Sequence, residues 1–221
     1  IGGHLDSWDL ATGAIDNGIG SFSVVDIARV FKSLHLKTKR TILFVLFMGE
    51  EQGLLGSKYM VSQLEKDNKI KNVKLMINLD MTNNTRGFNA GGNDSLMSIM
   101  TSIGTIMRQV DTTYANDISS SLGLHSDHQP FMLAGVPVSS SNGKLPPGAW
   151  GCYHADCDHF NLVIKDQLNN NVRYIAMILY ALANEDKLPV YYRNSDETKD
   201  LMIQYKLKDE LILGNEWHWA K

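Results

Sequence analysis

Two adjacent carboxylates stand at the end of an apolar run in this sequence. Glu50 and Glu51 follow "TILFVLF" and precede a glycine-rich turn in "MGEEQGLLGS". Like charges side by side are unfavourable unless a cation neutralises them. The pair therefore predicts a bound cation close to this turn.

Histidine and aspartate residues occupy comparable positions elsewhere in the chain, just after an apolar run or in a loop. They are His4 and Asp6 in "GGHLDSWD", Asp16 in "GAIDNGIG", Asp80 in "LMINLD", and His154 and Asp158 in "YHADCD". Each one alone is weak evidence, because an aspartate before a helix usually caps that helix. In open parallel sheets, however, functional groups gather beyond the carboxyl ends of the strands, and we therefore expect these side chains to meet.

The types of these residues indicate which metal they would bind. Histidine with carboxylates and without thiolates suits zinc, with cobalt or manganese as substitutes. Two histidines and three carboxylates are too many for one four-coordinate ion, and they suit two ions that share a bridging carboxylate. Two such ions can activate one water and polarise one carbonyl, while a free carboxylate takes the proton of the water. The sequence therefore predicts a two-metal hydrolytic site.

The elements that must position these residues follow from the apolar patterns. Continuous apolar runs predict strands buried on both faces, and helical spacing predicts helices between them. The predicted strands are 41–47, 73–81 and 135–141, and the predicted helices are 21–36, 56–67, 94–110 and 166–184, with a charged terminal helix over 195–212. Asp94 and Asp166 are candidate N-caps of their helices. This alternation predicts an α/β fold, with a mainly parallel mixed β-sheet sandwiched by helices.

Composition limits the classes of protein that fit. The chain has 221 residues, a net charge of −3, 43% hydrophobic and 20% charged residues, which is ordinary for one large globular domain. The charge gives no electrostatic basis for binding nucleic acid. No apolar run reaches the length of about 20 residues that a membrane span needs. The chain opens at "IGGHLD" without a basic and apolar leader, and we expect it to be truncated at its N-terminus.

Six segments of the sequence together resemble the M28 zinc peptidases, a family that includes di-zinc aminopeptidases, glutamate carboxypeptidase and carboxypeptidase Q. They are "GGHLDSWD", "GAIDNGIG", "FMGEEQGLLGS", "NLDM", "SDHQPF" with "GVPV", and "YHADCD", in the family's order and approximate spacing. The resemblance extends to about residue 185. It implies a zinc-peptidase/phosphorylase-hydrolase-like fold, one catalytic domain over residues 1–221, and a secreted or periplasmic protein.

The resemblance implies a role for each of the metal-binding candidates. His4 and Asp80 would bind one Zn²⁺ ion, Glu51 and His154 would bind a second, and Asp16 would bridge the two. In the family, the peptide that follows the bridging aspartate is cis.

The resemblance also assigns the residues around the ligands. Glu50 would be the general base, and Asp6 would orient the imidazole of His4 from behind. The choice between Glu50 and Glu51 as base and ligand comes from the resemblance alone. Asp127 and His128 would line or brace the site, and Asp158 would support its loop. Cys152 and Cys157 are too few for a disulfide framework, and they would be structural or paired.

The implied activity is hydrolysis of peptide bonds by a metal-bridged water, without a covalent intermediate. A peptide substrate and aminopeptidase or dipeptidase action rank first. A carboxypeptidase needs a basic pocket for the terminal carboxylate, and its candidates Arg86 and Arg108 are more typical of a solvated surface. A small-amide deacylase stays open as an alternative. A glutaminyl cyclase or a non-catalytic binding domain ranks lower, because every ligand position is filled.

Overall fold

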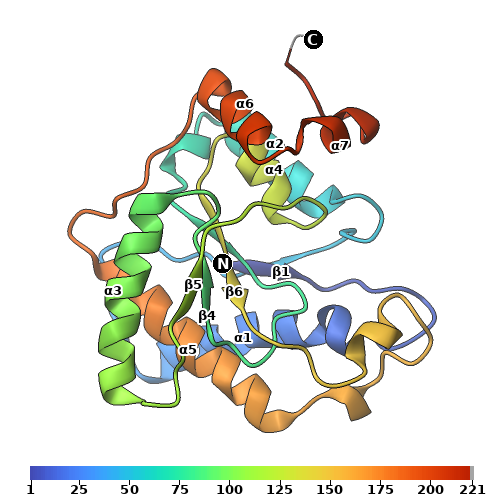
Figure 1. Ribbon diagram of the computed structural model, residues 1–221, viewed down its shortest axis with the longest axis vertical. Helices are drawn as coiled ribbons and strands as arrows, with labels where there is room; N and C mark the ends of the chain where they lie inside the picture. Colours follow the sequence, from blue (N-terminus) through green and yellow to red (C-terminus); the bar gives the residue numbers. More distant parts are fainter. Residues whose placement is uncertain (220–221) are drawn as a thin grey trace.

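A six-stranded sheet forms the centre of the protein in a computed structural model that describes residues 1–219 (Figure 1). Its strands are β1 (Gly2–His4), β2 (Val45–Phe47), β3 (Met76–Asn78), β4 (Gly87–Asn89), β5 (Asp117–Ser119) and β6 (Val138–Asn142). They lie in the order β2-β1-β3-β6-β4-β5, and every neighbouring pair is parallel except β4 with β6. The predicted mainly parallel mixed sheet is confirmed.

Helices cover both faces of this sheet. They are α1 (Ile19–Ser33), α2 (Leu55–Lys66), α3 (Asp94–Val110), α4 (His128–Leu133), α5 (Lys165–Asn184), α6 (Ser195–Gln204) and α7 (Lys208–Leu213). Helices α1, α3 and α5 contribute to one buried apolar cluster, and α2, α4, α6 and α7 contribute to a second. In Figure 1 these two groups lie on opposite sides of the strands. The predicted helix–sheet–helix sandwich is therefore confirmed. Within residues 1–219, no helix is long and apolar enough to span a bilayer.

The sequence misplaced one strand within the sheet. The run 41–47 was expected to be buried on both faces, yet only Val45–Phe47 is a strand, and it lies at the edge of the sheet. Leu43 and Leu46 are accordingly 55% and 37% exposed. An apolar run indicates that its residues favour a strand, but it does not indicate whether that strand lies at the centre or at the edge of the sheet.

The predicted N-caps of two helices were wrong. Asn93, with extended backbone, caps α3 by accepting a hydrogen bond from the backbone N–H of Leu96, and Asp94 is the first helical residue. Helix α5 begins at Lys165 with no side-chain cap, and Asp166 lies in its first turn. A carboxylate in the first turn is still favourable, because it faces the positive end of the helix dipole. The pattern therefore located both helix starts but not the capping atom.

The C-terminal segment is two helices rather than one. Helices α6 and α7 are separated at Lys206, which has a left-handed backbone with φ of 60°. Their charged residues are mostly exposed, as expected for a solvated face, while Leu201, Met202 and Leu211 are buried in the apolar cluster that α2 and α4 share. The segment is thus packed onto one face of the sheet layer.

The position of the α3 cap can be tested by substitution. Asn93→Ala removes the side chain that accepts the N–H of Leu96, and should lower the free energy of unfolding by about 1 kcal/mol. Asp94→Ala is the matched control and should have a clearly smaller effect. Urea denaturation of the two variants measures the difference. A larger loss for Asp94→Ala would contradict the assignment of the cap.

Candidate metal centre

His4 lies at the end of β1, and its side chain is only 1% exposed. Its Nδ1 hydrogen-bonds the backbone carbonyl of Asp6 at 3.0 Å, which directs Nε2 into the cluster. Nε2 lies 3.2 Å from Oδ1 of Asp16 and 3.4 Å from Oδ1 of Asp80, yet it has no hydrogen bond of good geometry with any of residues 1–219. Burial lowers the pKa of His4, but these carboxylates outweigh it and raise the pKa to about 11.

Asp16 lies in a short helical turn, Ala14–Gly18, directly before α1. The Asp16–Asn17 peptide is cis, as the resemblance implied. Asp158 holds this turn, because its two carboxylate oxygens accept the backbone N–H groups of Ile15 at 2.8 Å and Asp16 at 2.9 Å. The Oδ2 of Asp16 lies 3.3 Å from Nε2 of His154. Asp16 therefore presents one oxygen to each of two histidines.

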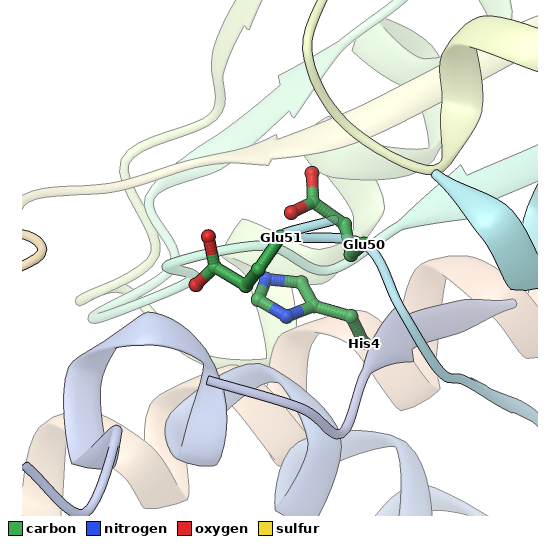
Figure 2. A group of neighbouring side chains, drawn as sticks. All are labelled: His4, Glu50 and Glu51. Atoms are coloured by element: carbon green, nitrogen blue, oxygen red, sulfur yellow. The ribbon is translucent and has the colours of Figure 1, made fainter. Parts of the chain in front are cut away.

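Glu50 and Glu51 follow β2 in the turn that leads to α2. The backbone N–H groups of both residues donate to the carboxylate of Asp6, each at 3.2 Å. Asp6 therefore orients His4 through its backbone carbonyl, and its carboxylate in addition fixes the Glu50–Glu51 turn. Figure 2 shows both glutamate side chains on one loop beside the His4 imidazole.

Asp80 follows β3 and receives a hydrogen bond from the hydroxyl of Ser126 at 2.6 Å. Asn78 in turn donates to the same hydroxyl oxygen at 2.6 Å. Despite burial, its contacts with His4 hold the pKa of Asp80 below its usual range. Ser126 is a site residue that the sequence did not single out. It stands in "HSDH", where the resemblance gave a role only to the neighbouring Asp127 and His128.

His154 lies in a loop that a disulfide between Cys152 and Cys157 closes. Its Nε2 is 3.3 Å from Oε2 of Glu51, and its ring stacks on Tyr153 with centroids 3.7 Å apart. Trp8 lies on this side as well, 5.0 Å from the His154 ring, and was not predicted. The two cysteines are therefore paired, and their disulfide closes the loop that carries His154.

The predicted ligands form overlapping groups whose donor atoms lie within 4.8 Å of one another. One group is His4, Asp16 and Asp80, and another is Asp16, Glu51 and His154. The groups share Asp16, and Glu50 adjoins them in a third group with His4 and Glu51. The structure thus brings together all six residues to which the resemblance gave a metal or a base role.

The electrostatics of the cluster fit bound dications. Burial raises the pKa of Glu50 to about 8, and burial with the charge of Asp16 raises the pKa of Glu51 to about 7. Buried Oε1 of Glu51 also lacks a hydrogen bond to any described residue. Carboxylates and imidazoles that face one another without mutual hydrogen bonds are the donor set that zinc prefers. The residues present therefore fit zinc.

The other candidate residues lie outside the cluster. His128 hydrogen-bonds the carbonyl of Gly123 at 3.1 Å, and Asp127 is fully buried beside the site. Burial raises the pKa of Asp127 to about 6. Arg86 is paired with Asp117 at 2.9 Å, on the edge strand β5.

Such a cluster at the carboxyl ends of a mainly parallel sheet is typical of metal-dependent hydrolases. The model of the family "Peptidase family M28" matches residues 1–179, and the chain belongs to this family. Carboxypeptidase Q from Xenopus laevis is 30% identical over 191 residues, which are 86% of this chain and 39% of that protein. The chain thus spans about two fifths of the length of the curated relatives it matches.

Solved structures agree with this assignment. A peptidase M28 precursor from Shewanella amazonensis SB2B has a TM-score of 0.70 and 27% identity, covering 87% of this chain and 42% of that one. The zinc aminopeptidase BSAP from Bacillus subtilis has a TM-score of 0.66 and 25% identity, covering 88% of this chain and 48% of that one. Both structures therefore share the fold of this chain over most of its length.

Metal binding should depend on pH in a defined direction. The Glu51 carboxyl, with its pKa near 7, and the His4 imidazolium must each lose a proton before they bind Zn²⁺. Zn²⁺ affinity should therefore rise from about pH 6 to about pH 8, with protons released on binding. Chelator competition measures the affinity, and calorimetry in buffers of different ionisation enthalpy counts the protons. Binding that is independent of pH and releases no proton would contradict the arrangement.

The disulfide loop should affect the metal through His154. The double variant Cys152→Ser/Cys157→Ser removes the closure and should weaken Zn²⁺ binding by about tenfold, the size typical for losing a group that orients a ligand. His154→Ala in the intact loop is the reference for complete loss of this ligand. Chelator competition ranks the three proteins. Unchanged affinity in the double variant would mean that the loop holds His154 without the disulfide.

Proposed function

We propose that this chain is the catalytic part of a zinc exopeptidase that binds two Zn²⁺ ions. Among the possible activities, aminopeptidase or dipeptidase action ranks first. The observation that carries the proposal is that two ligand groups share Asp16 while Glu50 stands beside them. His4 and Asp80 complete one group, and Glu51 and His154 complete the other. When bound, zinc would supply Lewis acidity, which makes water more acidic and polarises the carbonyl under attack.

Glu50 is the proton carrier in this proposal. In this role its carboxylate would accept the proton of the attacking water and later return that proton to the leaving amine. The N–H groups of Glu50 and Glu51 are both fixed by Asp6, so the base keeps a constant position beside its neighbour. Positioning of this kind reduces the entropy lost on reaching the transition state.

The lining of the cleft favours aminopeptidase action over a carboxypeptidase. Among the described residues of the lining, Lys58 is the only lysine or arginine, and Glu216 already pairs with it at 2.7 Å. Arg86 and Arg108 do not belong to this lining. The described lining therefore offers no unpaired lysine or arginine for a terminal carboxylate. Carboxypeptidase action and small-amide hydrolysis remain the alternatives, and relatives include carboxypeptidase Q by name.

The disulfide supports an exported protein. Disulfides persist in oxidising compartments and are rare in the cytosol. The Cys152–Cys157 bond lies in the loop that carries a predicted ligand. We therefore keep a secreted or periplasmic location as part of the proposal.

The role of Glu50 gives the direct test. Glu50→Gln keeps the shape but removes the base, and should lower kcat by at least about 100-fold on an aminoacyl amide while Zn²⁺ content is unchanged. A panel of aminoacyl amides, dipeptides and N-blocked peptides, each with and without chelator, separates the three activities. Hydrolysis that survives in Glu50→Gln would overturn the base assignment, and hydrolysis of N-blocked peptides alone would overturn the aminopeptidase reading.

A further inference from the structure

One wall of the metal cleft comes from residues that the family model does not match. The cleft has a volume of about 310 Å³ and is lined on one side by the metal cluster. Glu210, Leu211, Gly214 and Glu216 line it on another side, and all four lie beyond residue 179, where the family match ends. We call residues 210–216 the C-terminal wall.

The C-terminal wall is packed firmly. Leu211 is 1% exposed and belongs to the apolar cluster that α2 and α4 share. The segment that follows is tied back to α6, because the indole N–H of Trp219 hydrogen-bonds the carbonyl and hydroxyl of Ser195 at 3.0 and 2.9 Å. Figure 1 shows α7 on the same side of the molecule as α2 and α4. The wall is therefore a fixed part of the cleft.

Two glutamates of the C-terminal wall contact residues of the cleft that lie within the family match. Glu216 pairs with Lys58 of α2 at 2.7 Å, and its second oxygen accepts the side-chain N–H of Gln129 at 2.6 Å. Glu210 contacts Nε2 of His125 at 2.5 Å. Gln129 also accepts the backbone N–H of His125 at 2.7 Å. The two carboxylates thus belong to one polar network along the cleft.

The charges of this network do not balance. Lys58 is the only lysine or arginine among the described lining residues, and the wall supplies two carboxylates, of which Glu216 pairs with Lys58 and Glu210 contacts His125. Glu216 neutralises Lys58, so Glu210 leaves this network one negative charge in excess when histidine is counted as neutral. A substrate carboxylate at this wall would be repelled, and an ammonium or guanidinium group would be attracted.

We propose that Glu210 and Glu216 set the charge preference of the enzyme, so that it favours peptides with neutral or basic groups at this wall over free dipeptides. This inference rests on the proposed exopeptidase function. A free dipeptide carries its carboxylate one residue from the bond that is cut, whereas a dipeptide amide or a longer peptide carries no charge there. The wall therefore selects against substrates whose terminal carboxylate lies one residue from the bond that is cut.

The test compares a free dipeptide with the amide of the same dipeptide. The measured quantity is the ratio of kcat/KM for the free dipeptide to kcat/KM for the amide, in which any effect on the shared α-amine cancels. Glu216→Gln should raise this ratio by about three- to tenfold, as expected when one charge is removed from a solvent-exposed cleft, and the gain should shrink at high salt. Glu210→Gln should raise it in the same direction.

Two further variants make the test specific. Lys58→Met leaves Glu216 unneutralised, and should lower the ratio. Glu65→Gln removes the same charge from the exposed face of α2, and should leave the ratio unchanged. A ratio in Glu216→Gln that equals the ratio in Glu65→Gln would overturn the inference, while wild-type hydrolysis of both substrates would leave the proposed function standing. Wild-type protein that cleaves neither substrate with Zn²⁺ present would overturn the proposed function itself.

Discussion

The mutual repulsion of four carboxylates in one small space is the constraint on which this structure depends. Asp16, Glu50, Glu51 and Asp80 approach one another around the buried His4. Burial, together with the charges of the neighbouring carboxylates, raises the pKa values of Glu50 and Glu51, so the cluster favours either bound protons or bound cations. The surrounding fold must therefore hold negative groups together that would separate if their loops were free.

Two carboxylates outside the cluster hold it together by accepting hydrogen bonds from the backbone. Asp6 ties the end of β1 to the Glu50–Glu51 turn, and Asp158 ties the His154 loop to the turn that carries Asp16. Each bond to an ionised acceptor is stronger than a neutral one and is partly shielded from water. The ligand loops are thus fixed in pairs by groups that themselves need no metal.

The sequence predicted the fold class and the members of the cluster, because both depend on residue types at the ends of apolar runs. It did not predict that β2 is an edge strand or that Asn93, rather than Asp94, caps α3, because these depend on neighbours and on one backbone torsion. It also missed the hydrogen bond of Ser126 to Asp80 and the pairing of Glu216 with Lys58. These contacts join segments that are far apart in the chain, and no local sequence pattern predicts them.

The position of the C-terminal wall in the chain has a consequence for biosynthesis. A nascent chain has all of its predicted ligands once His154 has left the ribosome, yet Glu210 and Glu216 are still to be translated. Because domains fold progressively from the N-terminus during synthesis, the reactive groups can assemble before the surface that discriminates between substrates. A product that ended at the boundary of the family match would retain the ligands but lack selection by charge.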